Sequence, residues 1–184
     1  IVSGLARFGL SPDTYENFIQ TDAVIHPGNS GGALVDVSGA LVGINSVIYT
    51  ASNGNDLGRT GIGISLAIPS KLAEFVMNDL IRYGKVIRGW LGVSVEQLAR
   101  PATSAKGQRL LVRAVTPEGP AARAGLRAGD VITHFDDEPI DDVRLSMYEV
   151  SLLRPGERLS ITVRRDGDVL DLDAVVGTQP AENA

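Results

Sequence analysis

Short stretches in which apolar and polar residues alternate recur along this 184-residue chain, and they predict several β-strands. In the first half, residues 33–44 alternate around a Ser-Gly turn and predict a β-hairpin. One helical pattern follows, which opens at Pro69-Ser70-Lys71 and stops at Gly84. Its apolar residues fall at helical spacing and predict a packing element: Leu72, Phe75, Val76, Leu80 and Ile81.

The second half of the chain has the pattern of a compact α+β unit. Strands are predicted at residues 110–115, 130–135, 159–164 and 169–172, with a helix from about Asp142 to Leu153. A boundary between two units is therefore expected near Gly84. The final residues, 179–184, are polar and are expected to form a tail.

Composition supports this picture and excludes some functions. The 21 glycines and 9 prolines favour short strands and turns over long helices. A net charge of -5 gives no basic footprint for nucleic acid, so no nucleic-acid partner is expected. No window approaches the roughly 18 to 20 apolar residues that span a bilayer. The absence of cysteine excludes disulfides without choosing a compartment. Residues 50–58 are polar and rich in turn formers, which predicts a mobile loop.

The sequence Gly28-Asn29-Ser30-Gly31-Gly32 marks Ser30 as the leading candidate for chemistry, because glycines around a serine allow a loop to expose its hydroxyl. A serine hydroxyl needs a neighbouring base to become a nucleophile. Neither histidine suits that role. His26 lies four residues before Ser30 on the same tight loop, and His134 lies in a strand-like segment of the second unit, where a half-exposed strand residue is the expected role.

Two serine-hydrolase geometries can be compared with this pattern. The nucleophile elbow of α/β-hydrolases requires a helix after the serine, whereas residues 33–44 predict a hairpin, so that class is rejected. In the chymotrypsin-like order, histidine and aspartate precede the serine. The chain begins 29 residues before Ser30 and contains no suitable pair there. We therefore expect the chain to be a fragment whose catalytic histidine and aspartate are missing.

Three stretches of the chain resemble the HtrA (Deg) family of serine proteases. Residues 17–45 are similar to the family's serine region, residues 61–69 to its last barrel strand, and residues 86–93 to its entry into a PDZ domain. A single PDZ-like unit is typical of the DegS and AlgW type. The resemblance implies a mainly β fold. Residues 1–85 would be the incomplete second β-barrel of a chymotrypsin-like protease domain, and residues 86–178 an α+β PDZ domain.

The resemblance also implies roles around Ser30. Peptide bonds would be cleaved through an acyl-enzyme at Ser30, and the N–H groups of Gly28 and Ser30 would form the oxyanion hole. Asp22 is expected to hold a loop through hydrogen bonds and not to select the substrate. The residues expected to line the primary pocket are small or aliphatic, which favours a small aliphatic substrate residue over Lys or Arg: Val24, Ile25, Ser46 and Val47.

In the second unit, the resemblance implies a site for the free carboxyl terminus of a peptide. The segment Trp90-Leu91-Gly92-Val93 would be the carboxylate loop, in which Gly92 lets the backbone approach the anion. Leu91 and Val93 would form the floor of the pocket for the last side chain, with Met147 and Val150 closing it. The alternative for all four apolar residues is that they belong to the core.

The implied function is a regulated periplasmic endopeptidase of envelope stress signalling. Its PDZ domain would bind carboxyl-terminal peptides of misfolded outer-membrane proteins and thereby activate it. Peptide or protein substrates are expected, a homotrimer is the family's assembly, and no cofactor or metal ion is expected. Any inner-membrane anchor would lie upstream of Ile1. The alternative is a non-catalytic peptide-binding PDZ fragment.

Overall fold

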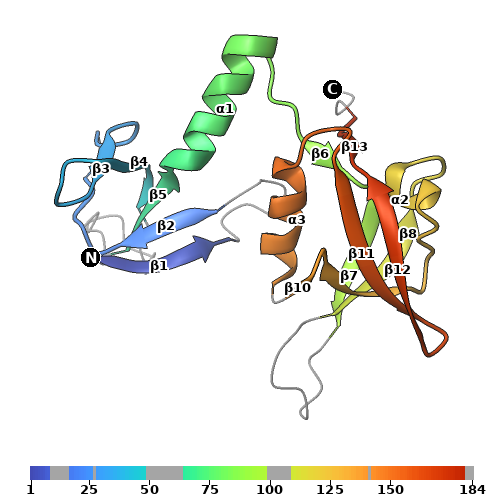
Figure 1. Ribbon diagram of the computed structural model, residues 1–184. Helices are drawn as coiled ribbons and strands as arrows, with labels where there is room; N and C mark the ends of the chain where they lie inside the picture. Colours follow the sequence, from blue (N-terminus) through green and yellow to red (C-terminus); the bar gives the residue numbers. More distant parts are fainter. Residues whose placement is uncertain (9–16, 27, 49–63, 99–108, 141, 181–184) are drawn as a thin grey trace, which may run out of the picture. The chain divides into compact units, whose positions relative to one another are not determined.

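The structure is a computed structural model, which describes residues 1–8, 17–26, 28–48, 64–98, 109–140 and 142–180 (Figure 1). The chain folds as two compact units, residues 1–86 and 87–184. Each unit has its own sheet and its own helix packing, and each is described here by itself.

The first unit is built on a five-stranded antiparallel sheet. Its strands are β1 (Val2–Arg7), β2 (Phe18–Thr21), β3 (Ala33–Val35), β4 (Leu41–Ile48) and β5 (Ser65–Pro69). They lie in the order β1-β2-β5-β4-β3. The described strands β1 and β3 lie at the two edges, so this sheet does not close into a barrel. The incomplete barrel expected from the sequence is confirmed in this form.

Helix α1 (Ser70–Tyr83) continues directly from β5 and packs against β4 and β5 (Figure 1). Gly84 ends it in the left-handed conformation, with its N–H donating to the carbonyl of Leu80. The start and stop of this helix agree with the sequence pattern. The buried apolar side chains described for this unit are few: Ile19, Ile25, Leu66 and Ala67.

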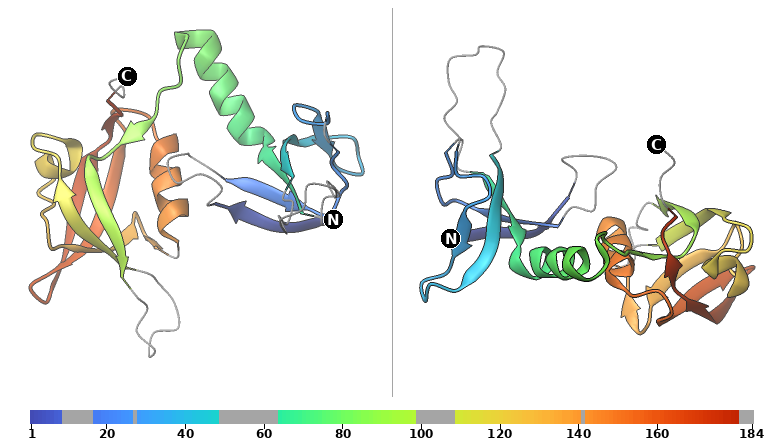
Figure 2. Two further views of the ribbon diagram at one scale, coloured as in Figure 1. Left: turned by 180° about the vertical axis from the view of Figure 1, so that it is seen from behind. Right: turned by 90° about the horizontal axis from the view of Figure 1, so that it is seen from above.

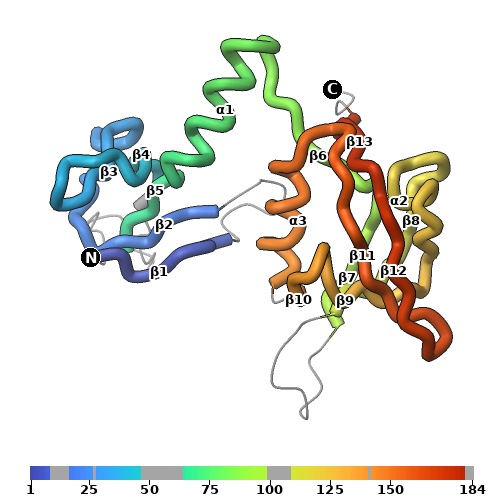
Figure 3. Tube along the Cα trace, viewed as in Figure 1, coloured from blue at the N-terminus to red at the C-terminus, as the bar shows by residue number. Residues whose placement is uncertain are grey.

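The second unit is built on a larger antiparallel sheet in the order β12-β11-β9-β8-β7 (Figure 2). Its strands are β7 (Val93–Leu98), β8 (Arg109–Val115), β9 (Val131–Phe135), β11 (Arg158–Arg165) and β12 (Asp168–Val175). The short strand β10 (Glu138–Pro139) pairs with β9, and β6 (Gly89–Trp90) pairs with β13 (Gly177–Thr178). Figure 3 shows the β11–β12 hairpin, which turns at Asp166-Gly167.

Two helices lie on either side of this sheet, α2 (Pro120–Arg123) and α3 (Val143–Leu152) (Figures 1 and 2). Asp142 caps α3, because its carboxylate accepts hydrogen bonds from the N–H groups of Arg144 and Leu145. The core between sheet and helices contains fully buried side chains from β8, β9, β11 and β12, among them Leu110, Ile132, Ile161 and Ala174.

The expected strands and the second helix are present close to their expected bounds. His134 is a half-buried residue on β9, as its sequence context predicts. The predicted tail begins at Gln179, whose N–H still donates to the carbonyl of Arg88 at 3.1 Å. The polar loop expected at residues 50–58, residues 61–63 of the stretch similar to a last barrel strand, and residues 181–184 of the tail lie outside the described residues.

Candidate functional site

Ser30 lies on an exposed loop between β2 and β3, and glycines give that loop its shape. Gly28 has φ of 104° and Gly31 has φ of 84°, values at which a side chain is strained. A methyl group on Gly32 would come within 3.0 Å of the carbonyl oxygen of Asn29. The loop conformation around Ser30 therefore depends on the glycines that the sequence places there.

Asn45 on β4 is joined to this loop by hydrogen bonds. Its carbonyl accepts the N–H of Gly31 at 2.8 Å, and its own N–H donates to the carbonyl of Gly32 at 2.9 Å. Its side-chain Nδ2 also reaches the carbonyl of Ala33, at 3.4 Å. Sequence reasoning assigned Asn45 no role, although the residue ends the stretch that is similar to the protease family.

The hydroxyl of Ser30 donates to the backbone carbonyl of Ser46, 3.2 Å away. Within the described residues it has no hydrogen bond to either histidine. His26 uses its carbonyl to accept the N–H of Asn29, and the Nδ1 atom of His134 lies 3.0 Å from the hydroxyl of Thr133. The described part of the chain thus presents Ser30 without a base beside its hydroxyl.

The N–H groups of the Ser30 loop differ in whether they have a hydrogen-bond acceptor. The N–H groups of Asn29, Gly31 and Gly32 all donate to backbone carbonyls. Those of Gly28 and Ser30 have no acceptor among the described residues. An anion near Ser30 could accept hydrogen bonds from these two donors, the pair that an oxyanion hole at this loop would use.

The residues expected to line a substrate pocket differ in exposure. Val24 is 72% exposed, whereas Ile25 is buried, at 6%. Ser46 is half-buried on β4 and contacts Ser30 through its carbonyl. Val47 follows it on β4, with a side chain that lies outside the described part of the structure.

Asp22 lies close to Ile1. Its N–H donates to the carbonyl of Ile1 at 3.2 Å, and the hydroxyl of Thr21 donates to the same carbonyl at 2.9 Å. These contacts join the start of β1 to the end of β2.

In the second unit, the segment Trp90–Val93 turns sharply into the edge strand β7. Gly92 has φ of 76°, and its carbonyl accepts the N–H of Thr116 at 2.8 Å. The carbonyl of Leu91 accepts the N–H of Ala121 at 2.9 Å. A methyl group on Gly92 would come within 2.9 Å of the Trp90 ring. Both carbonyls are therefore held by neighbouring segments of the unit.

Strand β7 is an edge of the sheet, since its one neighbour among the described strands is β8. The carbonyl of Gly92 accepts the N–H of Thr116, the residue that follows β8, and backbone groups of successive strand residues face opposite sides. The backbone groups of Val93 and Val95 therefore face away from β8. A further extended strand could pair with them by β-addition.

The apolar residues expected at a peptide pocket divide into two kinds. Leu91 and Val150 belong to the core, with exposures of 3% and 6%. Val93 and Met147 are partly exposed and pack against that core from β7 and α3. Trp90 is half-buried on β6. Val93 and Met147 are thus the two with surface left for a ligand.

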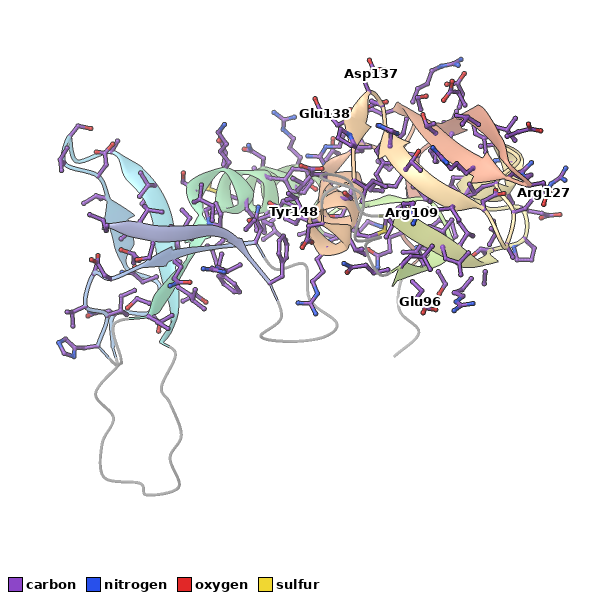
Figure 4. All side chains as sticks on the ribbon, turned by 90° about the horizontal axis from the view of Figure 1, so that it is seen from below. Glu96, Arg109, Arg127, Asp137, Glu138 and Tyr148 are labelled. Carbon is purple, nitrogen blue, oxygen red and sulfur yellow. The ribbon has the colours of Figure 1, made fainter. Side chains whose placement is uncertain are left out.

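Strands β7, β8 and β10 and helix α3 of the second unit also have charged side chains. Arg113 on β8 forms an ion pair with Glu96 on β7, and both side chains are more than half exposed. Burial, followed by the negative charge of Glu138, raises the pKa of Glu149 on α3. Figure 4 labels Glu96 and Glu138 in this unit. Sequence reasoning assigned none of these four residues a role.

In the described part of the chain, no group of three or more His, Asp or Glu side chains could hold a metal ion. None of the helices in that part combines the length and the apolar character that crossing a membrane requires.

Comparison with known families matches each unit separately. The trypsin-like peptidase domain family matches residues 1–44, and the PDZ domain family matches residues 89–176. These matches cover the Ser30 loop and the whole sheet of the second unit.

Curated relatives match along the whole chain. The serine endoprotease DegS of Escherichia coli (strain K12) is 41% identical over 187 residues, which covers 100% of this chain and 52% of DegS. The periplasmic serine endoprotease DegP of the same strain is 41% identical over 177 residues, covering 94% of this chain and 36% of DegP. The chain spans about half the length of DegS, or less for DegP.

Solved structures give the same result. The HtrA-type protease AlgW, solved with a tripeptide, is 46% identical with a TM-score of 0.76, and the match covers 97% of this chain and 59% of that one. Sequence and structure thus agree across both units. The chain belongs to the HtrA family of serine proteases, in which it comprises part of a trypsin-like peptidase domain followed by a PDZ domain.

Proposed function

We propose that the chain is the serine-bearing half of the protease domain, residues 1–85, and the PDZ domain, residues 86–178, of a regulated periplasmic endopeptidase. Ser30 attacks the carbonyl carbon of a peptide bond, and the amine leaves with a proton that a histidine transfers from Ser30. Water then hydrolyses the acyl-enzyme and regenerates the hydroxyl. The histidine and its aspartate come from polypeptide outside these 184 residues.

The observation that carries this proposal is the exposed Ser30 hydroxyl on a glycine-shaped loop, in which two N–H groups have no acceptor among the described residues and can donate to an anion. Gly28 and Ser30 provide the oxyanion hole. Losing one such donor costs about 3 to 4 kcal/mol of transition-state stabilisation, so a small rearrangement of the loop switches activity. Val24, Ile25, Ser46 and Val47 line the pocket, which accepts a small aliphatic residue.

Regulation comes from the second unit. A peptide with a free hydrophobic carboxyl terminus pairs with β7, and its carboxylate binds the N–H groups of the loop Trp90–Val93. Val93 and Met147 contact its last side chain, and Leu91 and Val150 support this pocket from the core. Such peptides come from misfolded outer-membrane proteins, and their binding relieves inhibition of the protease. Assembly as a homotrimer and membrane anchoring upstream of Ile1 complete the proposal.

A fluorophosphonate probe tests the catalytic part. The full-length gene product should be labelled at Ser30, and Ser30→Ala should abolish the labelling. The 184-residue chain alone should remain unlabelled, because Ser30 Oγ donates to the carbonyl of Ser46 and no base lies beside it among the described residues. Rapid stoichiometric labelling of the chain alone would contradict the assignment of the base to other polypeptide.

Peptide binding tests the regulatory part. A labelled decapeptide with a hydrophobic free carboxyl terminus should bind the 184-residue chain, and amidation of that terminus should abolish binding. Equal affinity for both peptides would rule out the carboxylate loop.

The second candidate function, a peptide-binding PDZ fragment without catalysis, is favoured by the absence of a base beside Ser30 in the described residues. Peptide binding together with failure of the full-length gene product to react with the probe would establish it.

A further inference from the structure

Glu96 occupies a particular place on the edge strand of the second unit. It lies near the middle of β7, with a side chain that is 53% exposed, and Figure 4 shows it at the outer side of the unit. Successive side chains of a strand point to opposite faces. Val93 and Val95 pack against the core, so Ser94 and Glu96 point to the other, open face.

The register of a bound peptide follows from the carboxylate loop of the proposed function. The carboxylate lies at the beginning of β7, so the peptide runs antiparallel to the strand. The last residue, position 0, is then opposite Val93, and each earlier residue is opposite the next residue of β7. Position −3 therefore lies opposite Glu96 and shares its open face, with Cβ atoms about 4.5 to 5.5 Å apart.

A bulge in β8 brings a second charge to this place. Ser94 pairs with Ala114, whereas Val95 pairs with Val112, which leaves Arg113 as the extra residue of β8. Because of the bulge, Arg113 and Ala114 are both exposed. The guanidinium of Arg113 reaches across to the carboxylate of Glu96. Arg113 lies one strand further from the peptide than Glu96 does.

We propose that Glu96 selects the residue at position −3 of the bound peptide by its charge, and that Arg113 limits this selection by holding part of the Glu96 charge. This inference rests on the peptide binding proposed above. A basic residue at position −3 is attracted to Glu96, and an acidic one is repelled. Opposite charges directly across a strand pair are stabilising, and like charges are destabilising.

Three labelled decapeptides test the proposal by fluorescence polarisation on the 184-residue chain. They share a hydrophobic free carboxyl terminus and differ in position −3, which is Lys, Gln or Glu. The Lys peptide should bind about fivefold more tightly than the Glu peptide, as expected for an exposed charge pair. The ratio should fall at high salt.

Variants identify the residues responsible. Glu96→Gln should bring the Lys and Glu peptides to nearly equal affinity, Glu96→Lys should invert their order, and Arg113→Met should widen the preference for Lys. Asp173→Lys is the matched control. It makes the same change of net charge on an exposed residue of β12, the opposite edge strand, and should keep the wild-type ratio.

The Gln peptide separates the two proposals. If the Gln peptide binds every variant and its amidated form does not bind, the carboxylate site stands. If Glu96→Lys then leaves the ratio of Lys-peptide to Glu-peptide affinity unchanged, the proposed selection by Glu96 is wrong. If no free-carboxyl peptide binds the wild-type chain, both are wrong. If Glu96→Lys and Asp173→Lys change the ratio of Lys-peptide to Glu-peptide affinity equally, the effect comes from net charge alone and the proposal is overturned.

Discussion

Two glycines with left-handed backbone geometry flank Ser30, and the loop they shape is joined to β4 by backbone hydrogen bonds from Asn45. The position of the Ser30 hydroxyl is therefore set by backbone conformation. A change that leaves every side chain of the loop intact can still displace it.

Gly31→Ala tests this dependence, with Gly39→Ala as its control. Both glycines have positive φ, 84° and 82°, and a methyl group on either meets nothing within 4 Å. Each substitution should cost about 1 kcal/mol of stability from backbone strain. Only Gly31→Ala should slow fluorophosphonate labelling of the full-length gene product, by about tenfold or more. Equal labelling rates in the two variants would show that Ser30 does not depend on this backbone geometry.

Among single residues, the sequence identifies the candidate nucleophile Ser30 but not the residues that contact its loop. Glycines bracketing a serine give a local signal, so Ser30 could be predicted from five residues. The role of Asn45 could not, because its contacts with Gly31 and Gly32 join segments that the chain order separates. The same holds for Glu96 and Arg113, which a bulge brings together.

Among the elements, those with a long periodic pattern were predicted close to their observed bounds. Strands β8 and β11 bury alternate side chains. Helix α1 has apolar residues at helical spacing, of which Leu72, Phe75 and Val76 are half-buried, whereas Leu80 and Ile81, also predicted to pack, are exposed. The two-residue strands β6, β10 and β13 are too short for any period. They form because their partners are in place, with Gly89 packed so tightly that a methyl group would lie 2.3 Å from the carbonyl oxygen of Val150.

A buried ion pair joins two elements of the second unit. The carboxylate of Asp130, which is 1% exposed, accepts two hydrogen bonds of 2.7 Å from Arg165 at the end of β11. It also accepts the N–H of Arg127, at 2.8 Å. Arg165 donates further to the carbonyl of Gly125. The pair therefore fixes the turn after α2 to β11.

Asp130→Asn should destabilise the second unit by about 3 kcal/mol, because removing one partner leaves the other charge without its counterion. Burial alone would raise the pKa of Asp130, but the hydrogen bonds from Arg165 and Arg127 outweigh it and hold the pKa below its ordinary value of 3.8. The stability from Asp130 is thus present above that value and is lost as pH falls through the lower, folded-state pKa.

Denaturant titrations of the 184-residue chain between pH 7 and pH 2 measure this effect. The unfolding free energy should fall more steeply with acid in the wild type than in Asp130→Asn, so the two curves converge at low pH. Asp173→Asn, on an exposed position of β12, should follow the wild type. Parallel curves for wild type and Asp130→Asn would mean that this pair contributes no pH-dependent stability.

In the whole molecule, the two units bury very different amounts of apolar surface. The core of the second unit contains 13 buried hydrophobic residues among those described. The first unit has four, Ile19, Ile25, Leu66 and Ala67, and it exposes large apolar side chains on both its sheet and its helix. Those more than half exposed include Ile1, Val2, Leu5, Val24, Met77 and Ile81.

Hydrogen exchange of the 184-residue chain should therefore divide along the unit boundary. Amides of Leu110, Ile132 and Ile161 should exchange slowest, since they open only when the packed core of the second unit unfolds. Amides of β1, β2 and β5 should exchange at least tenfold faster, because fewer buried side chains oppose their opening. In the full-length gene product, polypeptide that covers the exposed apolar faces should slow exchange in β1, β2 and β5 while leaving that of β8, β9 and β11 unchanged. Uniform protection across both units of the short chain would show that the first unit is stable without such a cover.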